Sequence, residues 1–198
     1  MANFATPIKV ARVEGSAGEA HPEIRRLPEK ATQTELKGSP VILDSGNYKV
    51  SGAISGSGVL LAGFTNEPFH NLTTADTAEH LSAGTPINQT NATVIPLGAP
   101  LSDGKIGVLI ANANTIFEGA FGTTDTATLP ASSDVGKIYG LTKDSGNSYW
   151  YVDKGKTTTG AGAILTVIGI HEQDIINTLA AGDRVLFKVS QANRLFDQ

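Results

Sequence analysis

The hydrophobic positions of the chain are densest between residues 104 and 122. Ile106, Val108 and Ile110 alternate on one face, and the positions between and after them are also apolar, which predicts a strand buried on both faces. A second strand is predicted over residues 115–121, after the turn residues 112–114, which include two asparagines. We therefore expect a β-hairpin over residues 104–122, at the centre of a sheet.

Other segments repeat the strand period of two. Residues 41–43 and 48–52 flank a turn cluster, and residues 134–142 and 148–153 flank another, so each pair predicts a hairpin. Residues 163–170 and 184–189 are further strands. The 22 glycines and the low charged fraction of 17% also favour many turns. We expect an all-β fold, a β-barrel or sandwich, with one continuous sandwich or two small lobes left open by sequence.

The first 37 residues contain few side chains that could form a core. Ile8, Val10 and Val13 alternate briefly, and glycine and proline interrupt every later pattern. This predicts an extended N-terminal arm that adds a strand to a neighbouring sheet, with a free tail as the alternative. The expected organisation is an arm over residues 1–37, a β lobe with the central hairpin over 38–129, and a C-terminal β lobe over 130–198.

Charge and cysteine content narrow the function classes. The chain has 198 residues, no cysteine and a net charge of −4, so disulfides and thiolate metal sites are excluded. The N-terminus has no secretory pattern and no apolar run could span a bilayer, so we expect a soluble protein made in the cytoplasm and not secreted by a classical signal. Six basic residues lie before residue 39, whereas residues 39–130 hold only Lys49 and Lys105. Without a basic stripe carrying aromatics, we expect neither nucleic-acid nor membrane binding.

No motif indicates catalysis, a cofactor or a metal. The four histidines have no ligand spacing and lie at His21, His70, His80 and His171. Glu172 and Asp174 beside His171 could form an acid–base cluster, although solvated residues in a turn are the simpler interpretation. The sequence therefore predicts a protein that is not an enzyme and has no catalytic, cofactor or metal site.

Three consecutive aromatic residues are the clearest candidates for a binding surface. Tyr149, Trp150 and Tyr151 alternate along a predicted strand, so at least one ring points away from the core. Such a ring could bind a sugar or a partner protein, whereas packing inside the fold is the more common role of strand aromatics.

The order of these features resembles the head decoration, or capsid cement, proteins of tailed bacteriophages. The resemblance covers most of residues 5–190. The resemblance rests on a polar N-terminal arm and on the motifs that come after it along the chain. These motifs are Leu36-Lys-Gly-Ser-Pro-Val-Ile-Leu, Gly58-Val-Leu-Leu-Ala-Gly-Phe, Val108-Leu-Ile-Ala-Asn-Ala-Asn-Thr-Ile-Phe-Glu, Val135-Gly-Lys-Ile-Tyr-Gly-Leu and Trp150-Tyr-Val-Asp.

The resemblance implies a structural virion protein on the outer surface of the capsid, which stabilises the shell by bridging neighbouring major capsid subunits. Its expected partners are the major capsid protein and further copies of itself, as a trimer or a dimer. We expect the arm to supply the contacts, through Ile8, Val10, Arg12, Val13, Arg25 and Arg26. The alternative function is a carbohydrate-binding or adhesin module on a virion or cell surface, with Tyr149, Trp150 and Tyr151 as its sugar platform.

Overall fold

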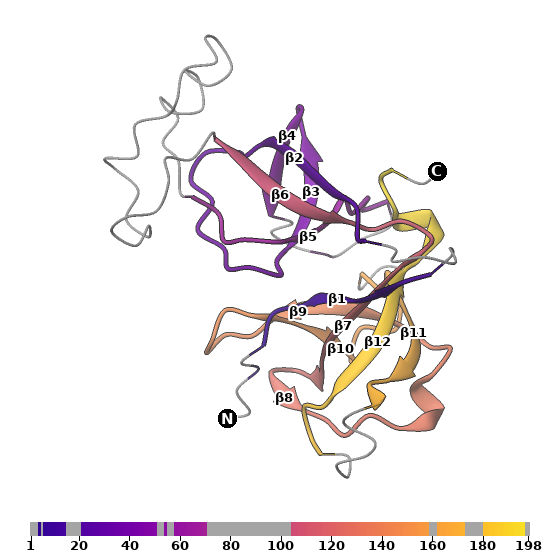
Figure 1. Ribbon diagram of the computed structural model, residues 1–198. Helices are drawn as coiled ribbons and strands as arrows, with labels where there is room; N and C mark the ends of the chain where they lie inside the picture. Colours follow the sequence, from indigo (N-terminus) through magenta and orange to yellow (C-terminus); the bar gives the residue numbers. More distant parts are fainter. Residues whose placement is uncertain are drawn as a thin grey trace.

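The computed structural model describes residues 4, 6–14, 21–50, 54, 58–70, 104–158, 162–172 and 180–196 (Figure 1). These residues form two antiparallel-rich β-sheets and two short 3-10 turns, η1 (Ser132–Asp134) and η3 (Gln191–Asn193). The fold is therefore all-β, as the sequence predicts. No helix in the described part of the chain is long and apolar enough to cross a membrane.

Five strands form the sheet in the upper part of Figure 1, all paired antiparallel. Their order is β2 (Ile24–Pro28), β6 (Lys105–Ile110), β5 (Gly63–Thr65), β3 (Pro40–Asp44) and β4 (Asn47–Val50). The sheet curls back on itself, because Glu29 after β2 forms a parallel bridge with Tyr48 in β4. The backbone N–H of Lys30 also donates to the Tyr48 carbonyl at 2.8 Å.

Five strands of the other sheet close into a barrel. Going round it, they are β7 (Thr115–Thr123), β10 (Trp150–Asp153), β9 (Ile138–Lys143), β11 (Leu165–Ile170) and β12 (Arg184–Val189), which pairs with β7 again. Only the β7–β10 pairing is parallel. Two further strands pair with β7 antiparallel, β1 (Lys9–Val13) and β8 (Thr126–Ala127).

The predicted central hairpin is wrong in its pairing, although both of its strands form. β6 pairs with β2 and β5, whereas β7 belongs to the barrel. The Asn112 side-chain oxygen accepts hydrogen bonds from the backbone N–H groups of Asn114 and Thr115, so the predicted turn exists and passes the chain from one sheet to the other. Both strands are buried on both faces, and such strands carry no sign of which neighbours cover them.

The other two predicted hairpins are confirmed. β3 and β4 pair with Leu43 opposite Tyr48, and β9 and β10 pair with Thr142 opposite Tyr151. Ser45 and Gly46 in the first turn both have positive φ angles, of 53° and 85°, as a two-residue hairpin turn requires.

One aromatic cluster joins the two sheets. Phe64 of β5 lies 4.7 Å from Phe117 of β7 and 6.0 Å from Phe187 of β12, between ring centroids. The end of the chain adds a backbone link, because the Leu61 N–H donates to the Asn193 carbonyl at 2.8 Å. The sheets thus share one hydrophobic core. The change of sheet falls between Ile110 and Thr115, and the division into lobes at residue 130 stays a prediction.

The N-terminal arm is extended, but its two strands belong to different sheets. β1 pairs with β7 of the barrel and β2 pairs with β6 of the upper sheet. Ile8 is completely buried. The arm is therefore part of both sheets in this structure, rather than a free tail over its described residues.

Candidate functional site

The N-terminal segment, residues 4 and 6–14, contacts the barrel through two apolar anchors. Phe4 stacks on Tyr151, with ring centroids 4.1 Å apart and planes 8° from parallel. Ile8 enters the main core. Both lie over glycines of β7: a Cβ added at Gly122 would overlap the Phe4 ring, and one added at Gly119 would lie 3.1 Å from Ile8 Cγ1. Because glycine has no side chain, Gly119 and Gly122 leave the space that Ile8 and Phe4 occupy.

A third glycine, Gly38, contacts the same segment and lies just before β3 of the upper sheet. Gly38 has a φ of +82°, and a Cβ there would lie 2.7 Å from both the backbone N and O of Ile8. Larger residues would therefore displace the segment and strain the backbone. We call Gly38, Gly119, Gly122 and Tyr151 the arm-binding surface.

Beside this surface, a buried carboxylate holds three cationic or basic side chains. Glu118, of which 4% is exposed, lies 3.0 Å from Lys9 Nζ, 3.0 Å from His171 Nε2 and 2.9 Å from Arg184 Nη1. Arg184 Nη2 also lies 3.1 Å from His171 Nδ1. Because a guanidinium can only donate, this geometry fits the tautomer in which Nδ1 accepts and Nε2–H donates to Glu118. Lys9 thereby ties β1 to the barrel electrostatically.

A second link ties the other end of the segment to the barrel. Lys188 Nζ of β12 lies 2.6 Å from Glu14 Oε2 and donates to the Ala113 carbonyl at 2.9 Å. The Glu14 backbone N–H donates to the Asn114 carbonyl at 2.8 Å. The hydrogen bond and charge of Lys188 lower the pKa of Glu14. The segment thus forms two ion pairs with the barrel, one from Lys9 to Glu118 and one from Glu14 to Lys188.

The apolar residues of the predicted arm contacts lie inward. Ile8 is buried in the core of this chain because β1 is paired with β7, and its role as a partner contact stays a prediction. Val10 packs against the same core and is half-buried, as is Val13. These valines hold the strand in place and offer little surface to a partner.

The three predicted arginines are exposed and lie on two strands. Arg12 of β1 is 3.8 Å from Glu14, and Arg25 of β2 is 2.6 Å from Glu23. Arg26 contacts Glu67 at 3.2 Å. The Arg25 guanidinium also lies 4.4 Å from the centroid of the Phe196 ring. The arginines are therefore presented to solvent in ion pairs with carboxylates that are themselves partly exposed.

Two of the three candidate surface aromatics are buried. Trp150 is 6% exposed and Tyr151 is fully buried, so the prediction of a surface site at these two residues is wrong. The reason is that β10 lies between β7 and β9, and all four of its residues are buried. Burial raises the pKa of Tyr151 to about 12. Tyr149 is half-buried, and it alone of the three retains surface for a sugar or partner.

A histidine–carboxylate pair lies at the end of the upper sheet. Glu29 is fully buried, and its carboxylate accepts the backbone N–H of His70 and approaches His70 Nδ1 to 2.8 Å. The hydrogen bond to Glu29 raises the pKa of His70 above its ordinary value of 6.5, because it favours the charged imidazolium. This pair is suited to holding the chain in place, because Glu29 and His70 bind each other.

A buried aspartate, Asp134, connects η1 with β9 and with Lys154, the residue that follows β10. Asp134 accepts hydrogen bonds from Tyr139 Oη at 2.7 Å and from the Ala131 N–H at 2.9 Å, and Lys154 Nζ lies 2.9 Å away. Burial alone would raise the pKa of Asp134, but the bonds from Lys154 and Tyr139 outweigh it and lower the pKa. Burial and this bond raise the pKa of Tyr139 to about 12.

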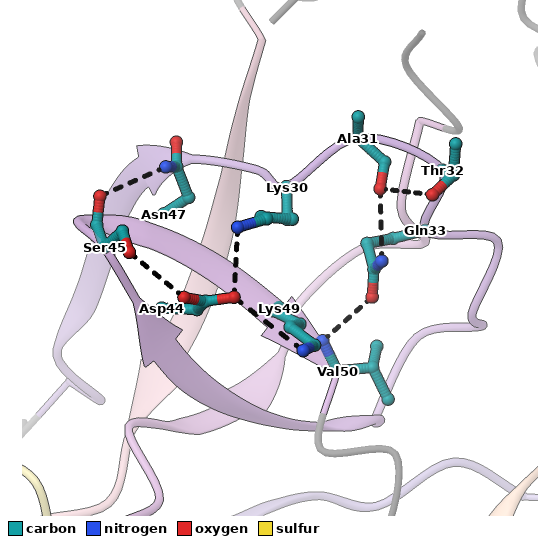
Figure 2. A network of polar contacts seen from close by, with 9 residues as sticks. All are labelled: Lys30, Ala31, Thr32, Gln33, Asp44, Ser45, Asn47, Lys49 and Val50. Carbon is teal, nitrogen blue, oxygen red and sulfur yellow. Dashed lines mark hydrogen bonds and ion pairs between the residues drawn. The ribbon is translucent and has the colours of Figure 1, made fainter. Parts of the chain in front are cut away.

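A partly exposed network lies at the turn between β3 and β4 (Figure 2). Asp44 lies 3.0 Å from Lys30 Nζ and 3.7 Å from Lys49 Nζ, and it accepts a hydrogen bond from Ser45. The hydrogen bond from Lys30 lowers the pKa of Asp44. Gln33 Oε1 accepts the Val50 N–H, as Figure 2 also shows. The network connects the residues that follow β2 with the β3–β4 hairpin.

Sequence reasoning did not find the buried carboxylates. Glu118 forms its contacts with residues far along the chain, 66 positions away for Arg184, and Glu29 contacts a histidine 41 positions away. A single charged residue inside the apolar run 115–121 was the available signal for Glu118, because isolated buried charges need partners. Of the predicted acid–base cluster, Asp174 lies outside the described residues, as does His80.

The described residues contain no group of three or more histidine, cysteine, aspartate or glutamate side chains arranged to hold a metal ion. Comparisons of the chain with protein-family models, with curated proteins and with solved structures found no match.

Proposed function

We propose that this protein is a capsid decoration protein, which binds the outer surface of a phage head and bridges neighbouring major capsid subunits. The observation that carries the proposal is the layout of the arm. β1 and β2 lie on different sheets, and between them they present Arg12, Arg25 and Arg26 to solvent. An all-β body with such an arm is consistent with the structural, non-catalytic role that the sequence motifs suggest.

The exposed ion pairs of the arm are weak enough to be replaced by ion pairs with another protein. Exposed ion pairs such as Arg25–Glu23 contribute roughly 0–1 kcal/mol, so replacing a glutamate of this chain by a carboxylate of a capsid subunit loses little. Many modest contacts of this kind, repeated around a symmetric shell, add through effective concentration. High affinity then comes from the number of contacts rather than from any single one.

The buried titratable groups support the same proposal. Glu29, Glu118 and Asp134 are each neutralised within the fold by cationic or hydrogen-bonding partners. Such pairs hold elements together: Glu118 links β1, β7 and β12, and Asp134 links η1 to β9 and to Lys154. This use of charge favours a protein selected for a fixed shape.

The proposal is tested by sedimentation with expanded heads of the phage that encodes the protein. Deleting residues 1–30 would remove Ile8 from the core and the buried carboxylate of Glu29, so single charge reversals are the sharper variants. We expect the wild-type chain to co-sediment at a fixed ratio and Arg25→Glu to bind on the order of tenfold more weakly. The matched control is Lys137→Glu, an equal charge change at an exposed residue of the barrel.

Two results would overturn the proposal. The wild-type chain would remain in the supernatant at all concentrations, or Arg25→Glu and Lys137→Glu would sediment equally with the heads. Circular dichroism of both variants shows whether each retains the β-fold, so that loss of binding is not confused with loss of structure.

A further inference from the structure

We propose that the N-terminal segment, residues 4 and 6–14, is an exchangeable strand, which occupies the arm-binding surface of a second copy of this chain when the protein assembles. The inference deepens the proposed function, on which it rests for the role of the assembly, by naming the element that joins copies. Its evidence is the way in which the segment is held.

The segment carries a complete set of recognition groups. Phe4 and Ile8 are apolar anchors, and Lys9 and Glu14 are charges of opposite sign. The barrel carries the complement of each, namely Tyr151 with Gly122 for Phe4, Gly119 for Ile8, Glu118 for Lys9 and Lys188 for Glu14. An identical barrel in a second copy offers the same complement in the same order.

Moving β1 leaves the other strand pairings of the described residues in place. The barrel closes through the pairing of β7 with β12, and β1 is not one of its five strands. In the described residues β1 pairs with β7 alone. Exchange therefore breaks no other strand pairing, and it restores the same contacts on the neighbour, which is why swapping an identical element is a low-cost route to oligomers.

An empty arm-binding surface is unfavourable, and this favours a second copy as the occupant. Removing the segment would expose Tyr151 and the core around Ile8, and would leave the buried Glu118 without Lys9. Because only a strand with Phe4, Ile8, Lys9 and Glu14 in this spacing satisfies all four points, another copy of the same segment is the best-matched replacement.

The test uses single-cysteine variants, because the chain has no cysteine of its own. Val13 and Thr115 are directly paired across β1 and β7, and such antiparallel pairs lie within reach of a disulfide. Val13→Cys and Thr115→Cys chains, one carrying a mass tag, are refolded together and oxidised. We expect a tagged–untagged dimer joined through positions 13 and 115, identified by mass spectrometry of its peptides.

The matched control is the pair Ile42→Cys and Lys49→Cys, which face each other across the β3–β4 hairpin. A hairpin with a two-residue turn cannot pass one strand to another copy, so this mixture should give no joined 42–49 peptides. Equal yields from the two mixtures would overturn the proposal, as would a Val13→Cys/Thr115→Cys double variant that forms only monomers with an internal disulfide.

A second measurement needs no substitution. Unlabelled and 15N-labelled wild-type chains are refolded together and treated with a carbodiimide, which joins a lysine amine to a nearby carboxylate as an amide with loss of water. If the segment is exchanged, about half of the Lys188–Glu14 links will join a light to a heavy peptide. Links within one isotope alone would contradict exchange. Neither experiment contains capsids, so failure of exchange is distinguished from failure of head binding.

Discussion

The two strands of the N-terminal arm have opposite environments. In and beside β1, Ile8 is completely buried and Lys9 reaches the buried Glu118. In β2, Ile24 is 48% exposed, and Arg25 and Arg26 point to solvent. The difference shows that two strands of the same arm can have different roles. β1 packs into the fold, whereas β2 presents charged side chains to solvent.

The largest expected effect separates the apolar residues of the two strands. Ile8→Ala should lower the free energy of unfolding by about 2–5 kcal/mol, because it leaves a cavity over Gly119 in the core. Ile24→Ala should change it by about 0.5 kcal/mol or less, because half of this side chain already contacts water. Urea denaturation measures both, and equal losses would contradict the distinction between the strands.

The acidic partners of the two strands should differ in the same direction. Glu118→Gln should cost about 1–3 kcal/mol, since Arg184 and Lys9 lose their shared counter-charge in a buried position. Glu67→Gln, which weakens the exposed pair with Arg26, should cost about 1 kcal/mol or less. A greater loss for Glu67→Gln in the same denaturation assay would contradict the view that β1, and not β2, holds the fold together.

Just beyond β2, the pair of Glu29 and His70 predicts a pH dependence. Glu29 raises the pKa of His70 in the folded state, so folding favours the protonated histidine. Its contribution to stability is complete below the ordinary pKa of 6.5 and is lost as the pH rises through the higher folded-state pKa. Wild type should therefore lose more stability than His70→Gln over this window in urea denaturation at stepped pH. Parallel curves would sink the prediction.

The smallest effect is expected for an arginine of β2 itself. Arg25→Glu should change the free energy of unfolding by less than about 1 kcal/mol, because its partner Glu23 is exposed. Thermal unfolding followed by circular dichroism measures this change. A large loss of stability would mean that β2 holds the fold together, which would contradict the proposed role of its arginines as partner contacts.

Much of the strand content follows from the sequence, because it depends on local patterns. The period of two and the turn residues predict β3 with β4 and β9 with β10, and both pairs form as hairpins. The same signals predict β6 and β7 but assign them to each other. Their pairing depends on contacts with β2, β5 and β12, which no local pattern encodes.

The residues of the candidate site were harder to predict from the sequence than the strands. Arg12, Arg25 and Arg26 of the predicted arm are exposed, and their contact with a partner stays a prediction. The burial of Trp150 and Tyr151 followed from the place of β10 between two strands, and only the assembled barrel reveals that place. Glycines at positions 119 and 122 gave no signal in sequence, because their importance lies in what packs over them.

The most direct test of the central claim, that the N-terminal strand joins copies of the protein, is the solution mass of the purified chain by light scattering. The account predicts a stable dimer or trimer of the 20.6 kDa chain. A mass of one chain at every concentration would contradict it.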